Sequence, residues 1–303
     1  MPVTDLATLN TQFGIDQQLV FTSGVGDLTV AEISNSYAQA VIALHGAHVL
    51  SFQPHGQRPV LWLSEHSQFK IGKAIRGGIP ICWPWFAAHP SDPTKPSHGF
   101  ARTTLWAVAG SEALADGSTQ LRLELHDSAE TQALWPHPFR LELVVTVGPA
   151  LQVDLNIYNP GDGPFVCTDA LHTYFGVSDI ANVTIRGLEN VAYLDKVDHD
   201  GRKMQQGPIT ITAETDRIYL DTTADCLIVD SSWQRRIRVA KQGSQTTVVW
   251  NPWIEKSQRM TDFGDEEYHG MVCVETTNAA DDVVTVPARG SHRLQTSITV
   301  EPI

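Results

Sequence analysis

The sequence has few basic residues for its length. Lysine and arginine together number 21 against 34 aspartates and glutamates among 303 residues, which gives a formal net charge of −13 and a pI of about 5.3. A protein that wraps the phosphate backbone of DNA or RNA needs positive charge on its binding face. The charge balance therefore argues against nucleic acid as a partner.

The sequence also lacks long hydrophobic runs. A helix that crosses a bilayer needs about 18 or more apolar residues, and the best candidate, 41–50, contains two histidines and a glycine. The first residues carry neither the basic cluster nor the apolar run of a secretory signal peptide. We therefore expect a cytoplasmic protein with no membrane partner.

Cysteine is scarce and widely spaced. The four cysteines are Cys82, Cys167, Cys226 and Cys273, and no two of them form a CxxC pair of the kind that binds zinc or performs redox chemistry. The sequence has no HExxH run, no Walker-type phosphate loop and no GxSxG elbow. These absences predict reduced thiols and weigh against metal, nucleotide and serine-hydrolase sites.

What the sequence does contain is alternation of apolar and polar residues. Hydrophobic residues make up 42% of the chain and charged residues only 18%, a composition that supports a packed core and excludes a disordered chain. In 141–147 and 151–157 every second residue is apolar, and Gly148 and Pro149 stand between the two segments. This pattern predicts an antiparallel hairpin. Similar strands and turns recur, so the fold class is predicted to be all-β, a large antiparallel sandwich.

Helical periodicity is confined to short pieces. The clearest is 128–135, with Asp127 or Ser128 as the cap and Pro136 as the stop. Further hairpins or tight connections are expected at 160–164 and 287–292. No repeat or polar linker divides the chain, which predicts a single domain over 1–303. Two domains of about 150 residues each remain the alternative.

Two arginines lie in glycine-containing segments. Arg76 precedes a glycine pair in 73–86, and Arg102 follows His98 and Gly99 in the next such turn. Each guanidinium presents two parallel N–H donors, so an arginine pair suits a phosphate dianion. On spacing alone, ion pairs with carboxylates at the rim of a sheet explain both arginines equally well.

Two further residues are candidates for proton transfer. His172 stands among apolar neighbours in 169–175, and its ordinary pKa lies near neutral pH. In 271–275 alternation places Met271, Cys273 and Glu275 on one strand face, where a carboxylate is unfavourable unless it is used or paired. A hydrogen-bonded core histidine and a structural salt bridge are the corresponding alternatives.

The remaining signals are weaker. Asp216 could bind a sugar hydroxyl, but an aspartate next to an arginine, here Arg217, is more often half of a surface pair. The acidic run 262–267 lacks the ligand spacing of a calcium loop, and we interpret it as a solvated turn.

Taken together, these segments resemble a known family. The strings IRGGIPICWPWF, HGFAR, LHTYF, ETDRIYLD, VVWNPW and DFGDEEYHGMVCVE occur in this order between Trp62 and Glu275. They are similar to those of the hexose-6-phosphate mutarotases, or glucose-6-phosphate 1-epimerases, of the aldose 1-epimerase (galactose mutarotase-like) superfamily. The resemblance implies a single-domain antiparallel β-supersandwich. It also implies an isomerase that interconverts the anomers of hexose 6-phosphates without metal or organic cofactor.

The resemblance also implies roles for particular residues. The catalytic pair would be His172 and Glu275, and Arg76 and Arg102 would surround the phosphate. His98 and Asp216 would hold sugar hydroxyls. The tryptophans Trp83, Trp250 and Trp253 would wall the pocket, although core packing explains them as well. The expected partner is a small hexose 6-phosphate, and we expect a monomer.

Other functions remain open at this point. The same sandwich could serve a non-catalytic protein that binds carbohydrate or sugar phosphate. It could also serve an aldose 1-epimerase that acts on free hexoses, or, less in keeping with the motifs, a metal-dependent enzyme. The presence of both His172 and Glu275 argues against the first, and the arginine pair argues against the second.

Overall fold

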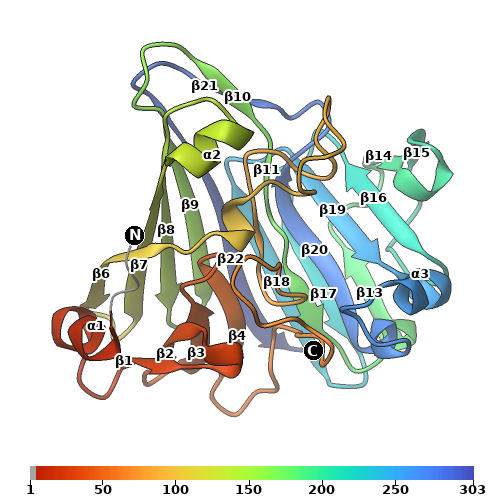
Figure 1. Cartoon of the computed structure of the whole chain (residues 1–303). Helices are drawn as coiled ribbons and strands as arrows, with labels where there is room; N and C mark the ends of the chain where they lie inside the picture. The colour runs from red at the N-terminus through yellow and green to blue at the C-terminus, as the bar shows by residue number, and fades with distance from the viewer. Residues whose placement is uncertain (1–4) are drawn as a thin grey trace.

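The computed structural model describes residues 5–303, and antiparallel strands dominate it (Figure 1). Sheet I runs in the order β15 (Gly201–Met204), β14 (Ala192–Asp195), β16 (Thr215–Tyr219), β19 (Thr246–Asn251), β20 (Met271–Asn278), β11 (Asp169–Leu171) and β5 (Ile81–Cys82), and β12 (Tyr174–Gly176) also pairs with β20. Sheet II runs in the order β13 (Val183–Arg186), β17 (Cys226–Asp230), β18 (Arg235–Gln242), β22 (Ser291–Pro302), β9 (Leu151–Tyr158), β8 (Arg140–Val147), β7 (Thr119–His126) and β6 (Ala107–Ala113).

Two smaller sheets complete the strands. Sheet III contains β1 (Leu19–Ser23), β2 (Thr29–Ser34), β3 (Ala38–Ala43) and β4 (His48–Pro54), and it lies at the bottom of the view in Figure 1. Sheet IV pairs only β10 (Phe165–Cys167) with β21 (Val284–Val286). This architecture confirms the all-β antiparallel sandwich that the alternation predicts.

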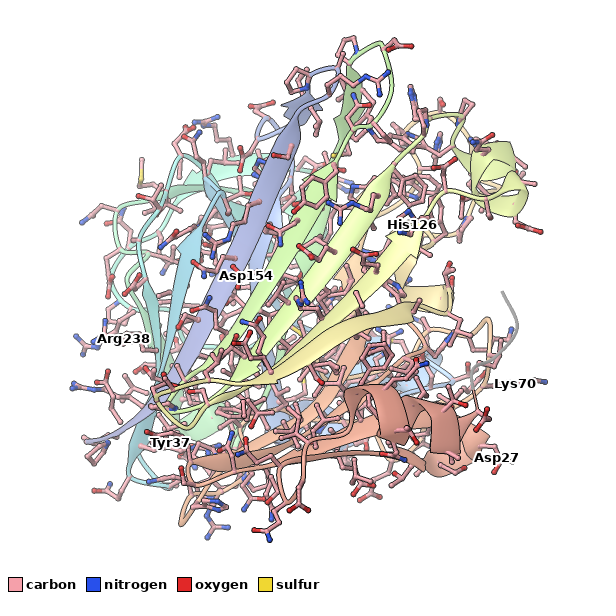
Figure 2. All side chains as sticks on the ribbon, turned by 90° about the vertical axis from the view of Figure 1, so that its left-hand side faces the viewer. Asp27, Tyr37, Lys70, His126, Asp154 and Arg238 are labelled. Atoms are coloured by element: carbon pink, nitrogen blue, oxygen red, sulfur yellow. The ribbon has the colours of Figure 1, made fainter. Side chains whose placement is uncertain are left out.

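The predicted hairpin is present as β8 and β9, which pair antiparallel along their whole length. Their apolar residues, such as Leu143 and Leu155, are fully buried in a core that also contains Val249, Val272 and Val274 of sheet I. The opposite face of sheet II is polar: Figure 2 shows Asp154 and Arg238 on it. Sheets I and II therefore enclose the main core between them.

Strand β20 is buried on both faces, and its two sets of side chains face different surroundings. Val272 and Val274 join the main core, whereas Met271 and Cys273 belong to a second apolar cluster on the other face of sheet I. Glu275 follows the same alternation as Cys273. The predicted grouping of Met271, Cys273 and Glu275 on one face is confirmed.

The helices are short. Helix α2 (Ala129–Leu134) begins at Ser128, whose hydroxyl accepts from the backbone N–H of Thr131 in a capping box, and it ends at Trp135 as predicted. Helices α1 (Leu6–Phe13) and α3 (Trp253–Arg259) were not predicted. Among residues 5–303 no helix is long and apolar enough to span a bilayer.

The expected hairpins or tight connections at 160–164 and 287–292 are present as tight connections between strands of different sheets. The first joins β9 to β10, and the second joins β21 to β22. Since β9 pairs with β22 and β10 with β21, each connection carries the chain between sheets II and IV. The Asn159 N–H donates to the Gly290 carbonyl and holds the two connections together.

Candidate functional site

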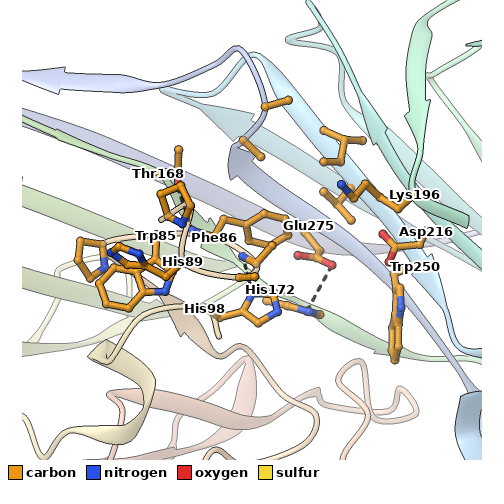
Figure 3. A pocket seen from close by; sticks show the side chains of 18 of the residues that line it. Trp85, Phe86, His89, His98, Thr168, His172, Lys196, Asp216, Trp250 and Glu275 are labelled. Carbon is orange, nitrogen blue, oxygen red and sulfur yellow. Dashed lines mark hydrogen bonds and ion pairs between the residues drawn. The ribbon is translucent and has the colours of Figure 1, made fainter. Parts of the chain in front are cut away.

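A cavity of about 790 Å³ opens on the face of sheet I that is turned away from the main core (Figure 3). Strands β16, β19 and β20 supply one wall, and the loops that carry residues 84–90 and 98, together with the end of β10 and Thr168, supply others. Five of the predicted site residues line it: Arg76, His98, His172, Asp216 and Glu275. Its size is typical of small-molecule sites.

His172 lies opposite Glu275 because of an interruption between two strands. Strands β11 and β12 both pair with β20, the first ending at Leu171 opposite Thr276 and the second beginning at Tyr174 opposite Cys273. Between them the His172 N–H donates to the Pro80 carbonyl instead of to β20. The chain therefore leaves the sheet at the position that faces Glu275.

The two side chains are in contact and buried. His172 Nδ1 lies 3.4 Å from Glu275 Oε1, and the side chains are only 9% and 1% exposed. The imidazole stacks on the Tyr174 ring at 4.8 Å between centroids, with 6° between the planes. Within residues 5–303, neither His172 Nδ1 nor Glu275 Oε2 has a hydrogen-bond partner, so both retain the capacity to bind a ligand.

Burial controls the charge of this pair. It raises the pKa of the Glu275 carboxyl well above its usual range, and the nearby Asp216 adds to the shift. Burial also lowers the pKa of His172 well below its usual value, helped by the neighbouring His98 and by the charges of Arg102 and Arg76. Both directions favour an uncharged resting pair in which Glu275 carries the proton.

His98 and Asp216 lie on opposite sides of the pair (Figure 3). The His98 ring contacts the Phe86 and His172 rings, with centroids 5.0 and 5.6 Å away, and burial lowers its pKa to about 3. Asp216 lies on β16, where burial raises its pKa and the Lys256 ammonium stands 3.7 Å away. The structure thus places a neutral imidazole and a carboxyl group on either side of the pair.

Arg76 and Arg102 have different environments. The Arg76 guanidinium donates to both carboxylate oxygens of Asp262, at 3.2 and 3.3 Å, and to the Tyr174 hydroxyl at 2.9 Å. Arg102 is not among the residues that line the cavity; its Nη2 donates to the Ser97 carbonyl, and its Nε is buried without a partner. The structure does not bring the two arginines together on the cavity wall.

Only one of the three candidate wall tryptophans lines the cavity. Trp250 does so from β19, at 8% exposure. Trp83 is fully buried and packs edge-on against Phe139 at 4.6 Å, and Trp253 begins α3 and contacts Tyr268 at 5.2 Å. Core packing, the alternative named for these residues, accounts for both.

The comparisons with known proteins identify the family. The sequence profile of the family described as aldose 1-epimerase matches residues 29–299. The chain belongs to the aldose 1-epimerase family. The match contains all of the motif strings quoted above, and it confirms the family that the sequence resembles.

Individual relatives cover most of the chain. An Escherichia coli (strain K12) protein named "Putative glucose-6-phosphate 1-epimerase" is 39% identical over 270 residues, which are 89% of this chain and 90% of that protein. A Cenchrus ciliaris protein of the same name is 38% identical over 82% of this chain and 77% of that protein. The crystal structure of a Salmonella typhimurium protein described as "a putative mutarotase (YeaD)" superposes with a TM-score of 0.89, 36% identity and 96% coverage of each chain.

Several cavity residues were missed from the sequence of this aldose 1-epimerase family member. Tyr174 lines the cavity and accepts a hydrogen bond from Arg76. Asp262, which the sequence predicts to lie in a solvated turn, does not line the cavity but binds the same guanidinium. Lys196 and Lys256 also line the cavity, and isolated lysines give no local signal. Only the packing of β14, β16 and α3 brings them to this place.

One group of metal-ligating atoms occurs at the site. A ring nitrogen of His172, the Cys273 thiol sulfur and a carboxylate oxygen of Glu275 lie within 4.8 Å of one another. The sequence predicts that the reaction needs no metal. That prediction does not address whether these three residues bind a metal ion that takes no part in the reaction.

Proposed function

We propose that the protein is a hexose-6-phosphate 1-epimerase, a mutarotase that interconverts the α and β anomers of hexose 6-phosphates and chiefly of glucose 6-phosphate. The observation that carries the proposal is the contact between His172 and Glu275, 3.4 Å apart in a cavity of about 790 Å³. The names of the curated relatives support glucose 6-phosphate as the substrate.

Ring opening needs one base and one acid at the same time. The Glu275 carboxylate removes the proton of the anomeric hydroxyl while the His172 imidazolium protonates the ring oxygen, so the bond from C1 to the ring oxygen breaks and C1 becomes a carbonyl. After rotation about the C1–C2 bond, the same groups act in reverse and close the ring on the other face. Neither oxygen has to carry a full charge alone.

The buried environment makes both groups effective in these roles. A carboxylate whose pKa is raised accepts a proton more readily, and an imidazolium whose pKa is lowered donates one more readily. The uncharged resting pair already holds the single proton that the reaction needs. Transfer of that proton from Glu275 to His172 produces the base and the acid together.

The other predicted residues hold the substrate in this proposal. His98 and Asp216 bind sugar hydroxyls on either side of the pair, and Arg76 binds the phosphate from the cavity wall. Arg102 is proposed as the second phosphate contact, which requires its guanidinium to turn from the Ser97 carbonyl toward the substrate. Fixing the ring at both ends positions it for proton transfer.

The net charge of −13 does not conflict with an anionic substrate. At physiological salt the Debye length is about 8 Å, so distant surface carboxylates are largely screened, whereas a cation in direct contact is not. Arg76, Lys196 and Lys256 all line the cavity and make its local charge less negative than that of the whole surface. The proposal includes a monomeric cytoplasmic protein whose reaction needs side chains alone.

A comparison of substrates tests the proposal. Anomer exchange of glucose 6-phosphate, glucose and galactose is measured by magnetisation-transfer NMR, with and without protein, at equal concentrations. We expect the largest acceleration over buffer for glucose 6-phosphate. Faster exchange of a free hexose would indicate an aldose 1-epimerase for unphosphorylated sugars, and no acceleration of any sugar would indicate a binding protein.

A further inference from the structure

Cys273 is a buried thiol next to the reacting pair that the proposed ring opening does not use. It lies on β20 two residues before Glu275, on the same face of the strand, and is 0% exposed. We propose that His172, Cys273 and Glu275 form an inhibitory binding site for a thiophilic divalent cation, with Zn²⁺ as the prototype. The site shares His172 and Glu275 with the proposed reaction, in which the ion has no part.

The positions of the three ligand atoms fit a tetrahedral ion. They lie within 4.8 Å of one another, and the His172 nitrogen is 3.4 Å from Glu275 Oε1. Zinc bonds of about 2.0–2.2 Å to nitrogen and oxygen at tetrahedral angles place two such ligands about 3.4 Å apart. The nitrogen and oxygen therefore already have the required spacing, and the sulfur, which lies within 4.8 Å of both, has to move closer to complete the set.

A second observation points to a ligand at the same place. Among residues 5–303, the buried Nδ1 atom of His172 and the buried Oε2 atom of Glu275 have no hydrogen-bond partner. Buried polar atoms without a partner are unfavourable, and a cation bound to Nδ1 and to the Glu275 carboxylate would relieve this. His172 and Glu275 also line the cavity, which gives an ion its path and leaves room for water as the fourth ligand.

The charges of the donor set suit a buried zinc site. On binding, the Cys273 thiol and the Glu275 carboxyl each release a proton to solvent, so two negative ligands neutralise the two positive charges of the ion. The imidazole of His172 binds in its neutral form and adds no charge to the set. A hard cation such as Mg²⁺ prefers oxygen ligands and gains little from the thiolate.

A bound ion would prevent catalysis because it occupies both members of the proposed pair. Sugar and metal should then compete for the cavity. The inhibition, but not the metal binding, rests on the proposed function. The two are therefore measured separately.

Binding is tested with Co²⁺ alone, in a buffer free of chelator and thiol. A thiolate ligand gives a near-ultraviolet sulfur-to-cobalt charge-transfer band, and tetrahedral coordination gives intense visible bands. We expect both bands in the wild-type protein and in the control Cys226→Ser, whose buried thiol lies on β17 in sheet II. In Cys273→Ser the charge-transfer band should disappear.

A second variant keeps the test valid if Cys273→Ser does not fold. Glu275→Gln removes another ligand without changing the size of the side chain, and it should weaken Zn²⁺ binding in equilibrium dialysis by more than about 100-fold. Circular dichroism checks that each variant is folded. No charge-transfer band in the wild-type protein, or an unchanged band in folded Cys273→Ser, would overturn the proposal.

Inhibition is tested by NMR anomer exchange of glucose 6-phosphate with increasing Zn²⁺. At a Zn²⁺ concentration ten times the measured dissociation constant, the wild-type rate should fall about tenfold at low substrate, as mass action requires. Cys273→Ser should lose this sensitivity, and Mg²⁺ should have no effect. Zinc binding without loss of activity would contradict the inhibitory role, whereas an inactive protein that still binds cobalt would contradict only the proposed function.

Discussion

At the scale of single residues, the burial of His172 and Glu275 determines what each can do. The same low-polarity surroundings lower the pKa of the imidazole and raise that of the carboxyl, so both groups are held away from their ordinary charged forms. Alternation in 271–275 predicted that a carboxylate would face inward, and the sequence placed a histidine among apolar neighbours. The 3.4 Å contact between them could not be predicted from spacing, because strand pairing creates it.

The charge of His172 is a testable consequence. The imidazole should be neutral at pH 7 and remain so as the pH falls below its ordinary pKa of 6.5, because burial opposes the charged form. Ring nitrogen chemical shifts in a ¹⁵N-histidine-labelled protein measure this directly, and His172→Asn identifies the signal. An imidazolium at pH 7 in the free protein would contradict the account.

The arginines give a second prediction. Arg76→Ala should raise KM for glucose 6-phosphate by about 10- to 100-fold, because the loss of a charge-assisted hydrogen bond costs about 1.5–3 kcal/mol. The KM for glucose, which has no phosphate, should change much less. Arg102→Ala should act in the same direction if its guanidinium reaches the phosphate. Steady-state kinetics with both sugars measure the ratio.

A matched control separates phosphate binding from the loss of an ion pair. Asp262→Asn removes the carboxylate partner of Arg76 but keeps the guanidinium on the cavity wall. It should therefore retain the preference for the phosphorylated sugar. The same ratio of KM values in wild type and both arginine variants would refute the phosphate assignment.

At the scale of elements, a segment without regular structure positions the site. Gly78 has φ of +60°, accepts at its carbonyl from the Tyr174 N–H, and donates to the Trp62 carbonyl. An added Cβ would lie 2.3 Å from the Val49 carbonyl oxygen and 2.8 Å from His48 Nε2. A larger residue at position 78 would clash with these atoms. Only glycine therefore allows the segment after Arg76 to lie against Tyr174, the first residue of β12.

Gly78→Ala should therefore destabilise the protein and disturb the site. The left-handed backbone costs about 1 kcal/mol or more for alanine, and the close contacts add about 1–3 kcal/mol, so we expect a loss of about 2–4 kcal/mol in the free energy of unfolding. Denaturant unfolding measures the loss. In the control Gly72→Ala, where φ is +79° but no atom lies within 4 Å of the added Cβ, only the backbone contribution should appear. Equal losses would show that packing around Gly78 is unimportant.

The elements also show where sequence reasoning succeeds and where it stops. Strands β8 and β9 and helix α2 were predictable because alternation, the turn residues and the Ser128 cap are all local in the sequence. Helix α3 lacks such a local signal, because Pro252 stands at its N-cap position and no side chain caps it. The turns at 160–164 and 287–292 were also predictable, but their residues do not decide between a hairpin and another tight connection. The strand pairing decides it, because each turn joins a strand of sheet II to a strand of sheet IV.

At the scale of the whole molecule, distant parts of the chain share one core. The main cluster extends from Leu9 to Ile298, and β22 near the C-terminus pairs with both β9 and β18. The site combines residues from Arg76 to Glu275. This interleaving supports the predicted single domain over 1–303, which stays a prediction.

Unfolding experiments test that prediction. The full chain should unfold in one cooperative step, with coincident fluorescence and circular dichroism transitions. Fragments 1–150 and 151–303 should each fail to fold, because the cut separates β8 from β9 and divides the core. Two resolved transitions, or a folded half, would favour the alternative of two domains.

The most direct test of the account is the rate of anomer exchange of glucose 6-phosphate in the wild-type protein, His172→Asn and Glu275→Gln, measured by magnetisation-transfer NMR. Both substitutions preserve side-chain size approximately, so substrate binding should change little. We predict that each lowers kcat by about 10²- to 10⁴-fold, the usual contribution of a general acid or base. Exchange at the wild-type rate in either variant would contradict the central claim that this buried pair opens and closes the sugar ring.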